Sequence, residues 1–504
     1  MLHIDDSLQP QALEAAFHKF WELSAAKITL IDRAADSCKG APVFTKDGRY
    51  TSRGWTDWTQ GFQFGAAILQ FDATGDQSFL QLGREQTVKL MTPHLTHFGV
   101  HDHGFNNVST YGNLWRLMNE GKIAENPWER AFYEMALKCS GAVQAKRWTA
   151  LQNGAGFIYS FNGPHSLFID TIRTLRSLAL AHMLGHVGKD ENDRGVSLLA
   201  RLLTHLKTTA QYAIYYGEGR DAYDVRGRVA HESIFNINDG NYRCPNSQQG
   251  FSPFTTWTRG LAWAILGFAE ELEFLSRLNA AELEPLGGWR DLESCILKAA
   301  QATADFYLAN TPTDGIPYWD TGAPCLHQLG DYLARPADPF NAFEPVDSSA
   351  AAIAAQGLLR LGYYLQQDLG SPPLNPPVNG GRFAEARTIS SPRLRGDKGG
   401  WCVSPVQQRD AASQGQTYWQ AGLTVVKTLL AAPYLSTKPQ HQGLILHSVY
   451  HRPNGWDHIP PGQKIPCGEA TMWGDYHARE IVLYLQRIIR QEPYLTFLGY
   501  LKHL

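Results

Sequence analysis

Apolar residues recur with the spacing of an amphipathic helix along most of this 504-residue chain. The alternation of apolar and polar residues that a half-buried strand needs is nearly absent. The pattern therefore predicts an all-α protein. The ranges predicted as helices are 10–27, 61–72, 79–93, 127–139, 167–185, 193–213, 258–276, 289–308, 347–368, 415–431 and 477–490.

Long connections rich in glycine, proline, asparagine and aromatic residues separate these helices. Residues 350–359 are rich in small side chains, which permits close helix–helix contact, and Asp347 begins a good N-cap sequence. No change of composition marks a domain boundary. The prediction is one closed helical toroid over 1–504, with a surface insertion near 371–412. No strict repeat occurs, so a helical solenoid is the weaker alternative.

Composition and charge limit the partners of the protein. A formal net charge of -3 provides no basic field for nucleic acid or for an anionic membrane surface. No apolar run approaches the length of a membrane span. The seven scattered cysteines lack CxxC spacing, and the first residues are acidic, without the pattern of a secretory signal. We therefore expect a cytoplasmic protein, monomeric or a small homo-oligomer, with reduced thiols.

The segment Trp257-Thr-Arg-Gly-Leu-Ala-Trp263 places two indole rings and a guanidinium at the start of a predicted helix. Flat aromatic faces suit sugar rings, and the planar fork of Arg259 suits a carboxylate. This combination favours an acidic sugar as ligand. The alternative is that the two tryptophans simply fill a core.

Asp170 follows the apolar triplet Leu167-Phe-Ile169 at the opening of another predicted helix. Desolvation there favours the protonated carboxyl group, as a general acid requires. The alternative is a carboxylate that stabilises the helix dipole. Arg173 and Arg176 follow within two helical turns, and either would lower the pKa of Asp170 if it pointed at that carboxyl group.

The loop His101-Asp-His-Gly-Phe105 places Asp102 between two imidazoles. Alternate histidines rarely converge on one ion without further ligands, so a catalytic or sugar-contacting loop is favoured over a metal site. The chain contains no phosphate-binding loop, dinucleotide fingerprint, HExxH or GxSxG motif. We therefore predict neither a metal nor a cofactor. Further aromatic and polar residues stand in loops that would line the mouth of a helical barrel, among them Trp58, His231, Gln249, Trp319, Asp320, His447 and Trp473.

The order of these motifs resembles glycoside hydrolase family 88, the unsaturated glucuronyl hydrolases. The resemblance spans roughly residues 50–490 and implies an (α/α)6 barrel. It also implies hydrolysis, without a metal, of oligosaccharides that carry a 4,5-unsaturated uronic acid at the non-reducing end. The matching pieces are Trp58-Thr-Gln-Gly-Phe62, His101-Asp-His-Gly-Phe105, Asp170, Trp257-Thr-Arg-Gly-Leu-Ala-Trp263, Asp314-Gly-Ile-Pro-Tyr-Trp-Asp320, Asp347-Ser-Ser-Ala-Ala-Ala-Ile-Ala-Ala355 and Trp473-Gly-Asp-Tyr476.

The resemblance assigns roles to individual residues. Asp170 corresponds to the general acid and base of the family, Asp102 to its partner carboxylate and His101 to a sugar contact. Trp58 corresponds to a stacking ring near the entrance. The residues expected around the unsaturated ring are His231, Gln249, Trp257, Arg259 and Trp263.

Three positions depart from the family pattern, and they bear on substrate choice. Gln63 replaces a tryptophan, Leu261 replaces a glutamine, and Thr174, next to Arg173, replaces an asparagine. An unsaturated rhamnogalacturonyl hydrolase, a uronidase with another substrate and a non-catalytic carbohydrate-binding barrel are the alternatives. The presence of both Asp102 and Asp170 argues against the binding module, since binding alone needs no buried acid.

Overall fold

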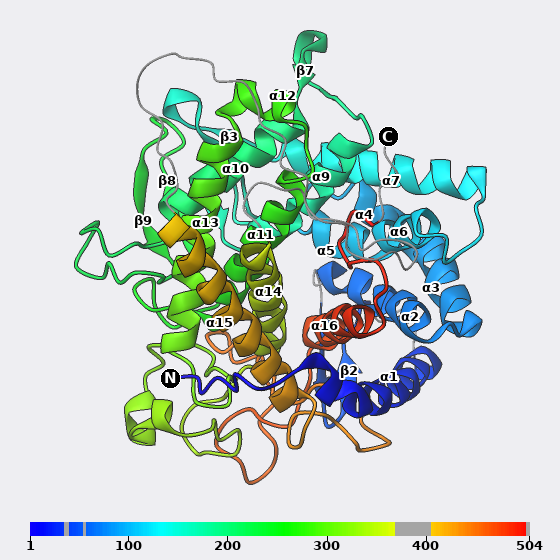
Figure 1. Ribbon diagram of the computed structural model, residues 1–504, viewed down its shortest axis with the longest axis vertical. Helices are drawn as coiled ribbons and strands as arrows, with labels where there is room; N and C mark the ends of the chain where they lie inside the picture. Colours follow the sequence, from blue (N-terminus) through cyan, green and yellow to red (C-terminus); the bar gives the residue numbers. More distant parts are fainter. Residues whose placement is uncertain (35–39, 54–56, 368–404, 500–504) are drawn as a thin grey trace.

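The computed structural model describes the chain except for residues 35–39, 54–56, 368–404 and 500–504. The described part forms six antiparallel helix pairs, each with one outer and one inner member (Figure 1). The outer helices are α1 (Glu14–Ala34), α3 (Gln77–Leu90), α7 (Pro127–Lys146), α10 (Leu198–Tyr212), α13 (Trp289–Ala309) and α15 (Pro405–Leu429). The inner members are α2 (Gln60–Thr74), the helical stretch α5 (His103–Asn107), η3 (Val108–Gly112) and α6 (Asn113–Asn119), the pair α8 (Thr171–Thr174) and α9 (Arg176–Met183), α11 (Thr258–Leu275), α14 (Ser348–Gln366) and α16 (Met472–Ile489).

The inner helices form a closed ring. Each of them contacts the next in chain order, and α16 packs against α2, which closes the circle. Helices α14 and α15 lie side by side and run in opposite directions, as Figure 1 shows. The predicted all-α toroid, an (α/α)6 barrel, is thereby confirmed.

Small residues allow the inner helices to approach one another. Every residue of α11 is buried, so this helix has no solvent face. A Cβ atom on Gly357 of α14 would lie 2.7 Å from the backbone nitrogen of Leu266 in α11. Only glycine permits this contact without movement of the backbone. The small-residue segment found in the sequence therefore lies where two inner helices touch.

The strands are short and lie in the connections between helices. The pairs are β1 (Phe44–Lys46) with β2 (Arg49–Thr51), β3 (Trp148–Ala150) with β4 (Gly156–Ile158), and β6 (Gly188–Lys189) with β7 (Gly195–Val196). A three-stranded antiparallel sheet joins β5 (Ser166–Phe168), β8 (Glu232–Phe235) and β9 (Tyr242–Asn246). In this sheet Phe168 pairs with Glu232, which brings the segment before α8 next to the segment before α11.

The structure corrects several of the predicted ranges. The range 167–185 begins as strand β5, and its helix starts only at Thr171. The stretch 103–119 is helical although no helix was predicted there, because its asparagine, glycine, serine and threonine residues are weak helix formers. Helix α15 begins at Pro405, so 405–412 belongs to a helix. The rest of the predicted insertion, within 371–404, lies outside the described residues.

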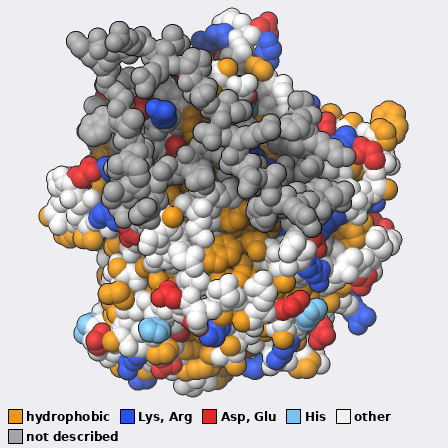
Figure 2. Space-filling view, in the orientation of Figure 1, with side chains coloured by type: hydrophobic (Ala, Val, Ile, Leu, Met, Phe, Trp, Pro, Cys, Tyr) orange, Lys and Arg blue, Asp and Glu red, His pale blue; other side chains and the backbone are white. Residues whose placement is uncertain are grey.

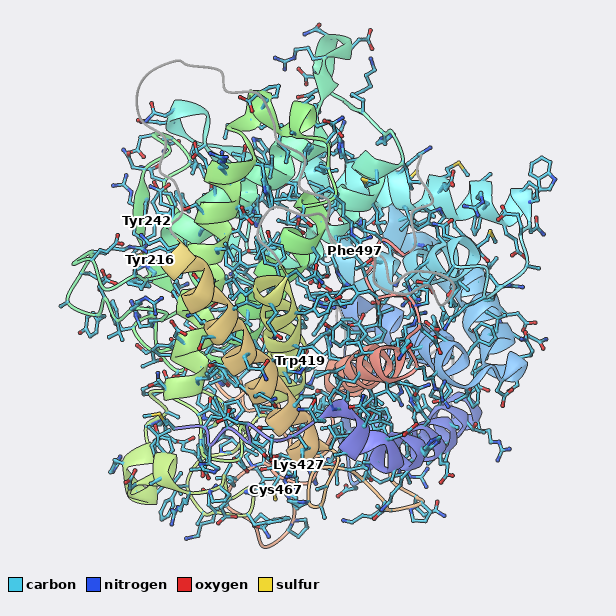
Figure 3. All side chains as sticks on the ribbon, in the orientation of Figure 1. Tyr216, Tyr242, Trp419, Lys427, Cys467 and Phe497 are labelled. Carbon is cyan, nitrogen blue, oxygen red and sulfur yellow. The ribbon has the colours of Figure 1, made fainter. Side chains whose placement is uncertain are left out.

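The connections that precede the inner helices share one end of the ring, since every inner helix runs in the same direction relative to its outer partner. Figure 1 shows two of them, drawn in yellow-green and orange, together at the lower edge. Figure 3 labels Tyr216 and Tyr242, which lie in the connection that precedes α11, toward the left of the view. Among the described residues, no helix combines the length and apolarity needed to cross a membrane. On the part of the face that Figure 2 draws in colour, acidic and basic side chains are interspersed without a broad field of one sign.

Candidate active site

A cavity with about 770 Å³ of empty space, part of it open to solvent, lies where the inner helices begin. Its walls come from the segments before five of the six inner helices, so residues far apart in sequence meet there. The residues that line it are Trp58, Val100, His101, Asp102, Phe105, Phe161, Asp170, Gln248, Gln249, Trp257, Arg259, Trp263, Tyr450, His451, Asn454 and Trp456.

Asp102 and Asp170 occupy equivalent places on neighbouring inner helices. Asp102 directly precedes α5 and Asp170 directly precedes α8. A Cβ atom on Gly104 would lie 2.4 Å from the carbonyl oxygen of Thr174, so the two helices touch through backbone. This close contact is the reason that the sequence needs glycine at position 104, and it brings both carboxyl groups to one cavity.

Neither carboxyl group caps its helix. Asp347, before α14, accepts hydrogen bonds from the backbone N–H groups of Ser349 and Ala350 in the ordinary way. Asp102 and Asp170 make no such bond, and Oδ1 of Asp170 is buried without a hydrogen-bond partner. Asp170 therefore does not cap α8, and its Oδ1 makes no bond within the protein that a ligand would have to displace.

Burial raises the pKa of Asp170 to about 7. The positive charge of Arg259 opposes this rise, while the nearby charge of Asp102 adds to it. Burial likewise raises the pKa of Asp102 to about 7, against the lowering effect of Arg147. The cavity thus holds two carboxyl groups that exchange protons near neutral pH, as general acid–base chemistry requires.

The two arginines that follow Asp170 point away from it. Arg173 donates hydrogen bonds to Glu270 at 3.1 Å and to Glu480 at 2.8 Å inside the barrel. Arg176 lies 3.6 Å from the same Glu270 carboxylate. The charges that shift the pKa of Asp170 are those of Arg259 and Asp102. Arg173 and Arg176 therefore do not oppose a role of Asp170 as an acid.

Arg259 is fixed by protein acceptors. Its Nη1 donates to Asp347 at 3.1 Å and to the carbonyl of Val449, and its Nη2 donates to Gln249 at 2.9 Å and to the carbonyl of Tyr450 at 2.7 Å. Its guanidinium lies between two indole rings, 4.6 Å from Trp257 and 4.8 Å from Trp473. Both terminal nitrogens are therefore occupied, and this arrangement differs from the expected free fork. Arg259 acts as a fixed positive charge that also joins three parts of the wall.

The three tryptophans predicted for the site all line the cavity. Trp58 is half-buried and stacks on Trp473, with ring centroids 4.9 Å apart. Trp263 packs on Phe105 at 4.8 Å. Trp257 and Trp263 are largely buried, so each presents only an edge or part of a face to the cavity. The wall is aromatic, as the sequence predicted.

The two predicted histidines differ in their positions. His101 lines the cavity, and neither of its buried ring nitrogens makes a hydrogen bond, although Nε2 lies 3.9 Å from Oδ1 of Asp102. His231 lies just behind the wall, packed on the ring of Trp257 at 4.9 Å. Its Nδ1 accepts the backbone N–H of Gln248 at 2.9 Å, so the ring proton is on Nε2. Burial lowers the pKa of His231 to about 3 and that of His101 well below its ordinary range, so both rings are neutral.

His101 and His103 do not converge on a common point. His103 faces away from the cavity, with Nδ1 near the Ser140 hydroxyl and Nε2 near the carbonyl of His97. Within the described ranges, no three histidine, cysteine, aspartate or glutamate side chains cluster as metal ligands would. The cavity combines aromatic rings with a few polar groups, as sites for small molecules do.

One wall of the cavity was not predicted. Tyr450, His451, Asn454 and Trp456 lie in the long connection between α15 and α16 and face the other predicted residues. The aromatic residues in that loop were the available signal. The three departures from the family pattern, Gln63, Leu261 and Thr174, are not among the residues that line the cavity, and neither is Arg173 beside Thr174.

Comparison with known proteins identifies relatives of this chain. It is 24% identical over 447 residues to the unsaturated glucuronyl hydrolase of Bacillus sp. (strain GL1), covering 87% of this chain and 89% of that protein. It is 24% identical over 324 residues to the unsaturated chondroitin disaccharide hydrolase of Streptococcus pyogenes serotype M1, covering 62% of this chain and 65% of that protein. No family model matches the chain.

Solved structures share the fold. The crystal structure of an unsaturated glucuronyl hydrolase specific for heparin superposes with a TM-score of 0.65 at 18% identity, covering 97% of this chain and 100% of that one. The resemblance inferred from the ordered motifs is thus confirmed by relatives that match most of the chain.

Proposed function

We propose that this relative of the unsaturated glucuronyl hydrolases is itself a glycoside hydrolase, acting on oligosaccharides with a 4,5-unsaturated uronic acid at the non-reducing end. The observation that carries the proposal is the pair Asp102 and Asp170, two uncapped carboxyl groups with pKa values near 7 in one aromatic cavity. A cavity that only bound sugar would gain nothing from burying two such groups, because their desolvation is costly.

Asp170 serves first as acid and then as base. Its proton goes to C4 of the double bond, and positive charge develops at C5 and the ring oxygen. The resulting carboxylate takes a proton from a water molecule, whose oxygen adds to C5. The product is a hemiketal that opens to a ketone, and the hemiacetal then formed at C1 releases the neighbouring sugar. Every proton is accounted for, and Asp170 ends protonated.

The other cavity residues act on charge and position. Asp102 favours the protonated form of Asp170 by its negative charge. The neutral ring of His101 has unsatisfied nitrogens that suit sugar hydroxyls. The fixed charge of Arg259 attracts the uronate carboxylate, and Gln249, held by Arg259, faces the same space. Trp58, Trp257 and Trp263 supply faces and edges for the ring.

The function is tested with a panel of disaccharides released by lyases from chondroitin, hyaluronan, heparin, xanthan, gellan and pectin. We expect loss of the absorbance of the C4=C5 bond with at least one glucuronyl substrate. Turnover of pectin-derived rhamnogalacturonide alone would favour the second candidate, an unsaturated rhamnogalacturonyl hydrolase. Binding of intact polysaccharide without turnover of any disaccharide would contradict the proposal.

Replacement of Arg259 tests its two roles separately. Arg259→Lys keeps a positive charge but loses the hydrogen bonds that hold Gln249 and the carbonyl of Tyr450, so the charge and the wall are no longer fixed and KM is expected to rise about tenfold. Arg259→Gln also removes the charge that lowers the pKa of Asp170. Activity needs protonated Asp170 and is lost as pH rises through its pKa, so the alkaline limb of kcat/KM should move to higher pH only in the glutamine variant. Identical pH profiles and KM values in both variants and the parent would contradict these roles.

A further inference from the structure

We infer that Phe251, with the stacked rings of Phe254 and Tyr223, forms a platform on the cavity rim that binds the sugar residues that follow the first one on the reducing side of the cleaved linkage. This inference rests on the proposed function and specifies the length of the preferred substrate. The protein would then favour tetrasaccharides or longer chains over disaccharides. These three residues together are called the rim platform.

The rim platform exposes large aromatic surface. The exposed fractions are 48% for Phe251, 42% for Phe254 and 50% for Tyr223. The rings of Tyr223 and Phe254 are stacked, with centroids 4.2 Å apart. Clustered exposed aromatic rings are uncommon on a soluble surface and mark ligand or partner sites. Aromatic faces are suited to the apolar faces of pyranose rings.

Chain continuity places the rim platform beside the cavity. Gln248 and Gln249 line the cavity, and Phe251 follows two residues later. A Cβ atom on Gly250 would lie 2.9 Å from Cβ of Trp257, so this loop folds back onto another residue of the cavity wall. Phe251 therefore lies next to this wall, where a sugar chain that leaves the cavity along it would meet the ring.

The loop that carries Phe251 and Phe254 is held in one conformation. Asp320 is fully buried, and its carboxylate accepts the backbone N–H of Phe251 at 2.8 Å and that of Gly322 at 2.9 Å. Nη1 of the buried Arg228 donates to the carbonyl of Pro253 at 3.2 Å. A loop fixed in this way presents its rings without an ordering cost when a ligand binds. The rigid exposure of the rings is the feature that favours a binding role.

The test compares kcat/KM for an unsaturated disaccharide and an unsaturated tetrasaccharide of the same repeat, using the whole protein. We expect the parent protein to prefer the tetrasaccharide. Phe251→Ala should lower kcat/KM for the tetrasaccharide about three- to tenfold and leave the disaccharide unchanged, whereas Phe251→Trp should keep the preference. The matched control is Trp128→Ala, which removes a ring that is 87% exposed at the start of the outer helix α7, away from the cavity end.

Several outcomes would overturn the inference while leaving the proposed function intact. One is a parent protein with equal kcat/KM for the disaccharide and the tetrasaccharide. Another is a Phe251→Ala variant whose kcat/KM falls equally for both substrates. A third is a Phe251→Ala variant that loses a dimer without any kinetic change, which would make this face a contact between copies of the chain. If neither substrate is turned over, the proposed function fails instead. Calorimetric titration with a saturated trisaccharide then tests whether the rim platform binds sugar. The inference stands only if Phe251→Ala binds the trisaccharide more weakly than Trp128→Ala does.

Discussion

Replacing Asp170 with asparagine is expected to lower kcat by at least about 100-fold, the usual contribution of a positioned general acid. The amide has nearly the same shape but holds no transferable proton, so protonation of C4 fails. Substrate binding should persist, because no hydrogen bond of Oδ1 within the protein is lost. Loss of absorbance at the double bond measures turnover. Quenching of tryptophan fluorescence measures binding, since four tryptophans line the cavity.

The matched control for this variant is Asp314→Asn. Asp314 is a half-buried aspartate whose pKa burial raises to about 6, but it is not among the residues that line the cavity. We expect near-parental kcat from this control. Near-parental turnover in Asp170→Asn would remove Asp170 from the acid role. Equal losses in both variants would indicate a general effect on stability, which thermal unfolding of the two proteins would reveal.

The sequence predicted most of the fold because the outer helices and several inner ones carry a clear helical period. It did not predict the inner stretch 103–119, which is buried along nearly its whole length and therefore has no polar face to produce a period. The start of α16 was placed at 477 instead of Met472 for a similar reason, because buried residues on all sides of the helix conceal its beginning. Helices of a closed inner ring are stabilised by their neighbours rather than by local propensity.

The sequence predicted which residues carry the chemistry better than it predicted their partners. The apolar triplet before Asp170 indicated a desolvated acid, and the pKa shift has that cause. The partners of Arg259 could not be predicted, because Val449 and Tyr450 lie 190 and 191 residues further along the chain. Such contacts depend on how the ring closes, and that information is spread over the whole sequence. The roles of His231 behind the wall and of Trp456 in it depend on the same long-range packing.

Asp102→Asn is expected to change the pH dependence of the reaction in the direction opposite to Arg259→Gln. The negative charge of Asp102 contributes to the raised pKa of Asp170, so its removal lowers that pKa. Because the reaction starts from protonated Asp170, activity is complete below the pKa and is lost above it. The alkaline limb of kcat/KM should therefore move to lower pH, and activity at pH 7 should fall.

The size of the shift of the alkaline limb distinguishes the effect of the Asp102 charge on the pKa of Asp170 from the effect of burial. Burial is the largest cause of the shift, so the pKa of Asp170 in Asp102→Asn should remain above the ordinary value of an aspartate. Raising the ionic strength should not reproduce the effect, since both groups are buried and screened little. Kinetics between pH 4 and pH 9 on the parent, Asp102→Asn and Asp314→Asn measure it. An alkaline limb that stays in place in Asp102→Asn while activity falls would show that Asp102 acts only by contact with the sugar, and the paired-carboxyl explanation of the acid would be wrong.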